Sequence, residues 1–475
     1  MLSFHKVALL FFASYALAGD GLPRYDAMKR QPGHGLILDS RAEKQERAVN
    51  VELLQDNLLG NEVQLLAEDV VHSAHTHKVE VSGLVPGRGR KYAAAVPIAK
   101  GEEIVSISID DVMSIETAKT GRINMLVEAN DHLPPAVVLA LHLLEEKFKG
   151  VDSHWHDFIA YLPSKLHSTL FASDENTELM EGSHVGRLTE TRRQAIADFF
   201  AALESPLTSN VVDPPFFTPA QFTLKNFQWA MVAVWAHSIL IPKEGNNTSN
   251  EPFDAVLVPI VSTLSPCDDC ENHITVEDGY LSLVATAPLA VGDEIQLSLG
   301  ANSMALYMLN HGFVPKAPSP HDVVQIGLQV ESSDPLLVFK NEILHMMNMT
   351  MDMVYAPAYG ASTLAPSMLQ SIRAKVLTTN ELKAYKRVLE KQVVSIRNEH
   401  AVCRALVQSI KALLGQYARS PAQVDAGLAD PNIASVTRDI LRAVQVEQTI
   451  LKTTHDLVLA HWSRLLTDDS LLPRD

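Results

Sequence analysis

The chain has few cysteines, a deficit of basic residues and, beyond its first residues, no long hydrophobic run. Its 3 cysteines, Cys267, Cys270 and Cys403, are an odd number, so at least one is free or pairs outside the chain. Its 39 lysines and arginines stand against 56 acidic residues, which gives a formal net charge of −17. Such a surface repels phosphate backbones and attracts basic tails. We therefore expect no nucleic-acid partner and favour a basic protein or peptide as the partner.

Residues 1–18 have the pattern of a secretory signal peptide. Lys6 precedes a short apolar run, and the small residues "ALA" follow at 16–18. That run is too short to cross a bilayer and no later run is long enough, so we expect no membrane span. The pattern predicts entry into the secretory pathway, with secretion, a luminal location or signal-led import into a plastid as destinations. A glycoprotein is predicted by the sequons at Asn246, Asn247 and Asn348.

Residues 19–78 form a polar N-terminal extension that contains the string "HSAHTH". Its three histidines are potential metal ligands, but no cysteine or carboxylate cluster accompanies them. We interpret this segment as a solvated linker and predict no metal site in it.

The remaining chain alternates between strand-rich and helix-rich segments. Apolar and polar residues alternate in "KVEVSG" and "EIVSISI", which predicts half-buried strands, and "VEDGYL" predicts a tight hairpin. Between about 115 and 250 the apolar spacing is helical, as in "PPAVVLALHLLEEKFKG". Strand patterns return in "DAVLVPIV" and "DEIQLSLG", and long amphipathic helices dominate after 320. This order predicts an α+β fold in which one small sheet is split by a helical insertion.

Several of these segments resemble the motifs of one family. They are "GRG" followed by "IAKGEEI", then "LALHLLEEKFKGVDSHWHDFIAYLP", and later "LAVGDEIQLSLGANSMALYMLNHGFVP". In this order they resemble the SET-domain protein-lysine methyltransferases of the Rubisco large-subunit methyltransferase type, which include the actin-histidine methyltransferase. The resemblance spans roughly residues 80–465. It implies a SET β-fold at 79–319, split by an insertion at about 115–250, and an all-helical substrate-binding-type domain at 320–475.

The resemblance also implies a cofactor and a substrate class. The family transfers a methyl group from S-adenosylmethionine to a protein or peptide side chain. The opening glycine motif, Gly87, Arg88 and Gly89, would approach that cofactor, and a plain turn is the alternative explanation for its glycines.

The sequence departs from the family where the chemistry occurs. A tyrosine–glycine pair normally aligns the methyl acceptor, and here the pair is Leu299–Gly300, which has no hydroxyl. Met304 stands for a usual asparagine and His311 for a usual tyrosine, while His237 takes the place of a frequent arginine.

The family's cofactor motif, L-V-P-x-x-D-x-x-N-H, can be placed in two ways on this sequence. If it is anchored on "LVP" at 257–259, Ser262 replaces the aspartate and Ser265–Pro266 replaces the asparagine–histidine pair. If it is anchored instead on "PCDDCENH" at 266–273, Asn272 and His273 match and would bind the cofactor. Sequence alone leaves both placements open.

The same "PCDDCENH" string admits other interpretations. Its two aspartates oppose a reactive thiolate, and zinc would lack a fourth ligand beyond Cys267, Cys270 and His273. We therefore expect no metal here and favour a surface loop closed by a local Cys267–Cys270 disulfide.

Two functions follow for the whole chain. One is a divergent S-adenosylmethionine-dependent protein-lysine methyltransferase with eroded catalytic motifs, whose catalytic residues the sequence does not identify. The other is a catalytically inactive SET fold that binds a protein or peptide in the secretory pathway. The sequence makes no prediction about oligomeric state.

Overall fold

A computed structural model describes residues 78–85, 89–130, 133–210, 212–242, 253–267, 270, 273–300 and 302–467. Several predictions therefore lie outside the described residues: the signal peptide, the polar extension, Gly87, Arg88, Asn246, Asn247 and Asn272. The described chain forms two compact units. The strand-rich unit holds the described residues of 78–165 and 207–298, and the helical unit holds those of 166–206 and 299–467.

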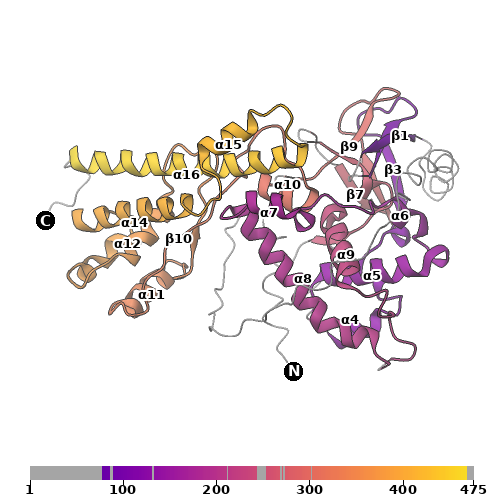
Figure 1. The fold of residues 1–475 in the computed structure, drawn as a ribbon, viewed down its shortest axis with the longest axis horizontal. Helices are drawn as coiled ribbons and strands as arrows, with labels where there is room; N and C mark the ends of the chain where they lie inside the picture. Colours follow the sequence, from indigo (N-terminus) through magenta and orange to yellow (C-terminus); the bar gives the residue numbers. More distant parts are fainter. Residues whose placement is uncertain are drawn as a thin grey trace. The chain divides into compact units, whose positions relative to one another are not determined.

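The strand-rich unit contains small sheets instead of one continuous sheet (Figure 1). One has the order β1-β2-β9-β6, from Val79–Val85, Gly89–Ala94, Glu294–Ser298 and Ser265–Cys267. Another has the order β3-β8-β7, from Glu103–Ser108, Tyr280–Val284 and His273–Glu277. A third pairs β4 with β5, from Ile239–Pro242 and Phe253–Val256.

The predicted hairpin is confirmed between β7 and β8. Glu277 pairs with Tyr280, so Asp278 and Gly279 form a two-residue loop, with φ of 52° and 80°. Such a loop needs two residues with positive φ, and Asp-Gly is a favoured pair for it. The strand patterns at 79–85, 103–108 and 294–298 are likewise confirmed.

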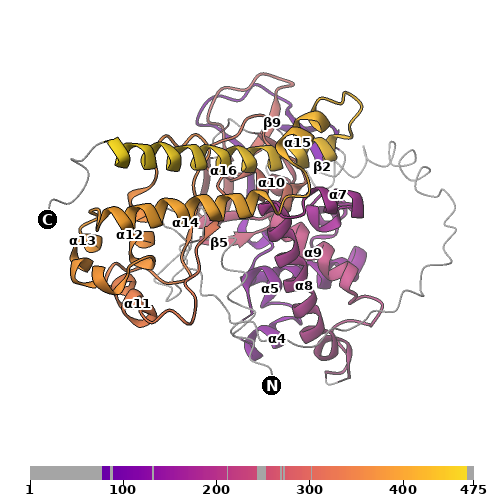
Figure 2. The same cartoon turned by 60° about the vertical axis from the view of Figure 1, so that its left-hand side comes forward.

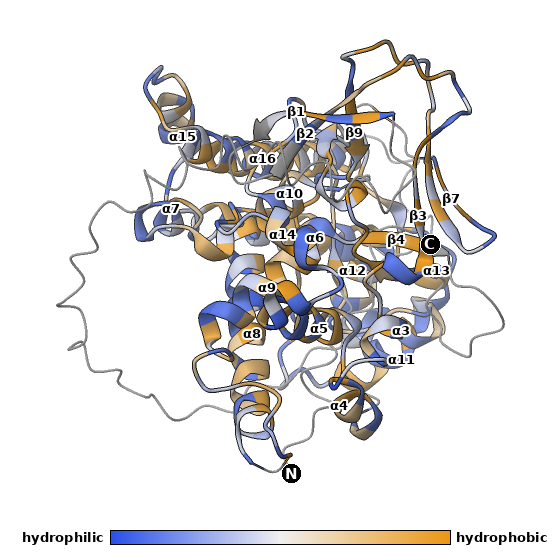
Figure 3. Ribbon diagram, turned by 90° about the vertical axis from the view of Figure 1, so that its right-hand side faces the viewer, coloured by the Kyte–Doolittle hydropathy of each residue, from blue (hydrophilic) through white to orange (hydrophobic). Residues whose placement is uncertain are grey.

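Helices of the strand-rich unit fill the predicted insertion. They are α3 at Ile115–Ala118, α4 at Asn124–Ala129, α5 at Pro135–Lys149, α6 at His156–Tyr161 and α9 at Leu224–His237. Helices α5 and α9 pack against each other, and Figure 3 shows a mixture of hydrophobic and hydrophilic residues along them. Pro135 starts α5 at its first position, and the side chain of Thr223 caps α9 by accepting a hydrogen bond from the Asn226 N–H at 3.2 Å.

The helical unit contains most of α8 and all elements after Leu299. Its helices are α7 at Asp174–Leu179, α8 at His184–Thr208, α10 at Met304–His311, α11 at Leu337–Met346, α12 at Pro366–Lys375, α13 at Tyr385–Leu389, α14 at Ile396–Leu414, α15 at Pro421–Leu428 and α16 at Ser435–Thr467. A short strand pair, β10 at Ile326–Gly327 and β11 at Val354–Tyr355, joins them. Helices α14 and α16 lie side by side in both views (Figures 1 and 2).

The division into compact units differs from the predicted domain boundaries at two places, and the boundaries themselves stay predictions. The described residues of 299–319, predicted as the end of the SET domain, lie in the helical unit. Residues 166–206, predicted as part of the SET insertion, belong to the helical unit. Glu447 of α16 is one reason, because its carboxylate accepts the N–H groups of His184 and Val185 at 2.7 and 3.0 Å. These N–H groups belong to the first turn of α8 and lack intrahelical acceptors.

Among the residues that the structure describes, none of the helices is both long enough and apolar enough to cross a bilayer.

Candidate functional site

The candidate site is built around the parallel strand pair of β6 and β9. Ser265 lies opposite Gln296, Pro266 opposite Leu297 and Cys267 opposite Ser298. Parallel neighbours are not joined by a tight turn, and these two strands are separated by the whole β7–β8 hairpin. The pairing brings Ser265–Pro266 beside the strand that runs directly into Leu299–Gly300.

The turn that leads into β6 is strained at its backbone. Ile260 has φ 64° and ψ −61°, and the N–H of Val261 donates to the Pro259 carbonyl at 2.7 Å. This is a γ-turn of the rare hand, and a β-branched residue with positive φ is an outlier. Ile260 is buried, so packing around its side chain holds the strained conformation. Strain of this kind clusters at functional sites, which marks the loop after "LVP" as a place of interest.

Side chains on both sides of this turn hold it in place. Ser262 Oγ accepts the Val258 N–H at 2.7 Å, and the Ser262 carbonyl lies 2.8 Å from Nδ1 of His237. Burial lowers the pKa of His237, so the ring is neutral and donates its Nδ1–H to that carbonyl. Thr263 Oγ1 donates to the Ile260 carbonyl at 2.8 Å and lies 3.1 Å from the Tyr92 hydroxyl. Through its hydrogen bond to the Ser262 carbonyl, His237 acts as a positioning residue for the turn.

The residues of β6 do not supply the groups by which the resemblance would hold S-adenosylmethionine. Ser265 has a hydroxyl in place of a carboxamide, and Pro266 has neither an imidazole nor a backbone N–H. Ser265 is buried, and within the described residues its Oγ has no hydrogen-bond partner. One orphaned hydroxyl remains where an asparagine–histidine pair would offer several polar groups. The residues at this edge do not fit the cofactor in the family's manner.

The residues after β9 lack a catalytic phenol at the expected position but have one nearby. Leu299 is half-buried, and its carbonyl accepts the side-chain N–H of Asn302 at 2.7 Å. Tyr307 of α10 is buried, and its hydroxyl donates to the Gly300 carbonyl at 3.1 Å. Met304 and His311, two more of the departures, begin and end α10. Tyr307 thus brings a hydroxyl to the Leu299–Gly300 pair from one helix further along the chain.

The predicted cofactor residues are distributed over separate places. Gly89 begins β2 opposite Val85, while Gly87 and Arg88 lie outside the described residues. His273 begins β7, is exposed and pairs with Val284 in the β3-β8-β7 sheet. It lies in a different sheet from β9, whereas Ser265–Pro266 is hydrogen-bonded to β9. The strand pairing therefore favours the placement anchored on 257–259, and the roles of Gly87, Arg88, Gly89, Asn272 and His273 stay predictions.

The loop after β6 contains the predicted local disulfide. Cys267 and Cys270 are bonded, with Cα atoms 5.9 Å apart, and Cys403 of α14 is buried and free. Burial raises the pKa of the Cys403 thiol to about 12, so it stays protonated and unreactive.

The sequence analysis missed one cluster of potential ligand side chains. Helix α5 carries His142, Glu145 and Glu146, all buried, with one potential ligand atom from each within 4.8 Å of the others. The spacing H-x-x-E-E on a predicted helix was the available signal, because residues three and four apart share a helix face.

Comparisons with known proteins agree with the fold. Residues 331–451 match the family model described as Rubisco LSMT substrate-binding. The chain is 25% identical over 285 residues to the actin-histidine N-methyltransferase of Rattus norvegicus and 27% identical over 294 residues to that of Drosophila melanogaster. These alignments cover 58% of this chain in each case but 46% and 52% of the relatives. The chain thus spans about half the length of the curated relatives it matches.

Solved structures match over most of the chain. The SET domain of LSMT bound to MeLysine and AdoHcy has a TM-score of 0.74 at 18% identity, covering 86% of this chain and 93% of that one. Rubisco LSMT bound to AdoMet has a TM-score of 0.73 at 19% identity, with the same coverage. Both the predicted fold class and the predicted resemblance are confirmed. The chain therefore resembles the SET-domain protein methyltransferases of the Rubisco LSMT type, and it has an α+β SET fold with a helical C-terminal region that includes the match to the substrate-binding family model.

Proposed function

We propose that this chain binds a protein segment with its substrate-binding-type domain and does not transfer a methyl group. The observation that carries the proposal is the parallel pairing of β6 with β9. It puts Ser265 and Pro266 next to the strand that ends before Leu299, and none of the three side chains offers the amide, imidazole or phenol that the family chemistry uses.

Losing these groups should strongly reduce the rate of methyl transfer. Removing one preorganised polar contact from a transition state costs on the order of 100-fold in rate. A missing phenol combined with a weakened cofactor site therefore brings transfer below useful turnover, while the fold that recognises a protein segment is unaffected.

The chain offers a surface suited to a basic, partly apolar segment. Helix α11, within the residues that match the substrate-binding family, exposes Val338, Phe339 and Met346 by 72%, 58% and 56%. Glu342 is exposed between them, one turn from both Val338 and Met346. Apolar anchors beside a carboxylate, on a chain of net charge −17, fit an amphipathic segment that carries lysine or arginine.

Calorimetry with S-adenosylmethionine tests the first half of the proposal. We expect no heat of binding at millimolar cofactor for the natural chain. The back-substituted variant S265N/P266H/L299Y restores the three family side chains, and micromolar binding by this variant would identify these positions as the cause. Incorporation of radioactive methyl from the cofactor into any polypeptide by the natural chain would contradict the proposal.

Fluorescence anisotropy tests the second half. Labelled peptides rich in lysine and leucine are compared with glutamate–leucine peptides of equal length, and we expect binding of the basic set alone, weakening as salt screens the charges. V338S/F339A should weaken binding about 10-fold, since truncating buried anchor side chains often costs more than 1 kcal/mol. V151S is the matched control, because Val151 is also exposed, by 81%, but lies on the strand-rich unit. Equal binding of both peptide sets would contradict the proposal that the partner is a basic segment.

Tyr307 supports the second candidate, a divergent methyltransferase. Its hydroxyl lies at the Gly300 carbonyl, 3.1 Å away, and would replace the missing phenol of Leu299. The radioactive-methyl assay separates the two functions. Labelling that is lost in Y307F but kept in Y280F, a change of another tyrosine, would establish the enzyme.

For location, we propose the secretory pathway. The proposal is supported by the signal-like residues 1–18, by the Cys267–Cys270 disulfide and by the sequon at Asn348. Asn348 is exposed on the turn after α11, with φ 56°, where a glycan can be attached without disturbing the core. A mass shift after glycosidase treatment of protein from a secretory host, absent in N348Q, is expected. Recovery of the protein only from the cytosol would contradict this location.

A further inference from the structure

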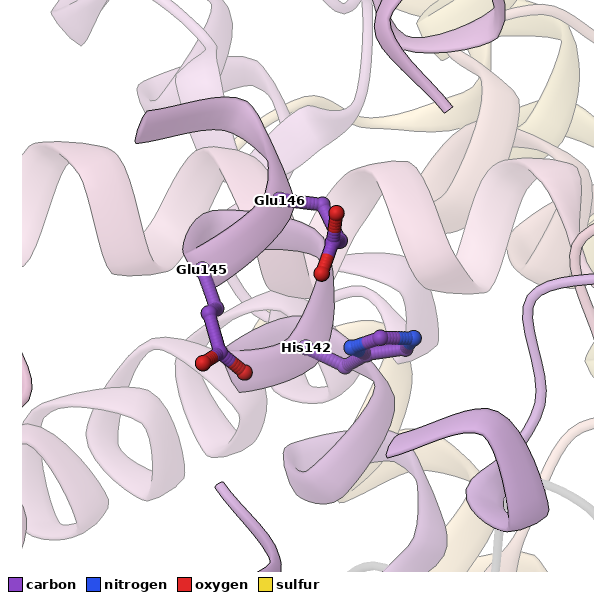
Figure 4. Close-up of side chains that lie close together, drawn as sticks. All are labelled: His142, Glu145 and Glu146. Atoms are coloured by element: carbon purple, nitrogen blue, oxygen red, sulfur yellow. The ribbon is translucent and has the colours of Figure 1, made fainter. Parts of the chain in front are cut away.

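Helix α5 carries three potential metal ligands on one face. His142, Glu145 and Glu146 are spaced i, i+3 and i+4 along Pro135–Lys149, and Figure 4 shows their side chains leaving neighbouring turns. One potential ligand atom from each residue lies within 4.8 Å of the other two. Ligand atoms around one divalent ion, with bonds of about 2.0–2.2 Å, lie about 3–4.4 Å apart, so small rotamer changes would close the set.

The cluster is buried and only partly satisfied. His142, Glu145 and Glu146 are exposed by 1%, 8% and 3%. Within the part of the chain that the structure describes, Nδ1 of His142 and Oε2 of Glu145 have no hydrogen-bond partner. A buried polar atom without a partner destabilises the fold, because burial removes its hydrogen bonds to water. A bound metal ion would give both atoms, Nδ1 of His142 and Oε2 of Glu145, a partner.

The remaining ligand atoms are held by protein contacts that orient them. Oε1 of Glu145 accepts the Arg122 N–H at 3.0 Å, and Oε2 of Glu146 accepts the Ser153 hydroxyl at 2.7 Å. Lys149 is paired with the other oxygen of Glu146 but is 40% exposed and free to turn to solvent. Second contacts of this kind fix ligand orientation in known metal sites.

The His142 ring is also fixed in position. Its Nε2 lies 3.4 Å from Thr117 Oγ1, and its ring packs edge-on against Trp155 at 5.1 Å. Its Nδ1, which has no hydrogen-bond partner among the described residues, is the nitrogen that the ring can offer to a metal ion.

We propose that His142, Glu145 and Glu146 bind one divalent transition-metal ion, with zinc as the best match. An imidazole nitrogen with carboxylate oxygens is a typical zinc set, and zinc accepts a fourth ligand such as water. The ion would satisfy the two orphaned atoms and balance the buried carboxylates. Its role is structural, because it would tie α5 to the segments that hold Thr117, Arg122 and Ser153. The site is separate from the β6–β9 edge and does not depend on the proposed function.

A competing explanation is that the cluster binds no metal and Oε2 of Glu145 simply lacks a partner among the described residues. The two explanations differ in metal content. The full-length chain is dialysed against micromolar zinc chloride, and bound zinc is measured by mass spectrometry. We expect about one zinc ion per chain with the three-ligand site, and a melting temperature that rises with zinc and falls with chelator.

Variants assign the zinc to this cluster. E145Q keeps the shape of the side chain but weakens it as a ligand, and H142A removes the nitrogen, so both should lose the bound ion. G121A keeps all three ligands, but its new Cβ would lie 2.8 Å from Oε2 of Glu145. That displacement should weaken zinc binding about 10-fold, the lower range for changes around metal ligands.

Two controls make the result decisive. H345A/E342Q removes the same residue types at the same i, i+3 spacing from α11, where both are exposed, and should keep the zinc. All measurements are repeated in an H72A/H75A/H77A background, because those histidines could take up zinc independently. If the natural chain binds no zinc, or if E145Q and H142A keep it in this background, the proposal is wrong.

Discussion

The Glu399 carboxylate in the helical unit and the Ser265 hydroxyl at the β6–β9 edge are both buried, but only the carboxylate has hydrogen-bond partners among the described residues. In the helical unit, Arg373 donates two hydrogen bonds to the buried carboxylate of Glu399 at 2.8 and 2.6 Å, and His461 lies 3.0 Å from it. At the β6–β9 edge, Ser265 is buried without a partner in the described structure, and Pro266 offers no donor.

This difference shows that fold and chemistry are carried by different residues. Stability comes from apolar burial and from paired buried charges such as Arg373–Glu399 in the helical unit. The few side chains at the β6–β9 edge lie outside that pairing and can change with little effect on the core. A chain can therefore keep the SET fold while the residues at this edge differ.

The largest expected loss of stability comes from breaking the buried Arg373–Glu399 pair. E399Q leaves a buried guanidinium without its counter-charge and should lower the free energy of unfolding by about 3–5 kcal/mol. Urea denaturation followed by circular dichroism measures it. E116Q is the control, because the Lys119–Glu116 pair is exposed and should contribute less than about 1 kcal/mol. Equal effects of the two changes would remove the contrast between the regions.

Next in size is the close packing at Gly312, the left-handed C-cap of α10. G312A should destabilise the chain by about 3 kcal/mol or more, because backbone strain adds to steric overlap. Its Cβ would lie 1.6 Å from the His167 carbonyl oxygen, at φ 69°. G360A has a similar φ of 75° and nothing within 4 Å, so it should cost only about 1–2 kcal/mol. Thermal unfolding of both variants tests whether packing, beyond backbone strain, fixes this helix end.

At the β6–β9 edge, by contrast, we expect a substitution that is neutral or slightly increases the free energy of unfolding. S265A removes a buried hydroxyl that has no partner in the described structure, so it should be neutral or stabilise the chain by up to about 1 kcal/mol. A clear loss of stability in urea would show that the hydroxyl has a structural partner, and the edge would then resemble the helical unit.

The smallest effect is a pH dependence at Glu381. Partial burial raises its pKa, but hydrogen bonds from Arg397, Ser395 and Thr378 outweigh this and hold the pKa at about 2. A depressed carboxyl pKa adds stability above its ordinary value near 4.5 and loses it as pH falls toward 2. Because Arg397 is half exposed, we expect less than about 1 kcal/mol. E381Q should flatten the stability curve between these pH values, and an unchanged curve would contradict the assignment.

Local patterns determined much of the fold. The hairpin at Asp278–Gly279, the alternating strands and the proline-started helix α5 follow from backbone preferences over a few residues. The Cys267–Cys270 disulfide was equally local. The placement that the strand pairing favours for the cofactor motif was not local, because β9 lies beside β6 in the sheet but follows it in the chain only after the β7–β8 hairpin. The ligands on α5 were missed because their burial depends on segments from elsewhere in the chain.

The sequence by itself determined the α+β class, the helical end domain and the absence of a phenol at Leu299, since side-chain identity and short-range periodicity are written in the chain. Only the tertiary structure decided that Ser265–Pro266 lies beside β9, that Tyr307 reaches Gly300 and that two glutamates and a histidine are buried together. The reason is physical: the parallel pairing joins strands that are separated by a whole hairpin, and the burial of Tyr307 and of the α5 cluster depends on how other segments pack around them, which no local preference specifies.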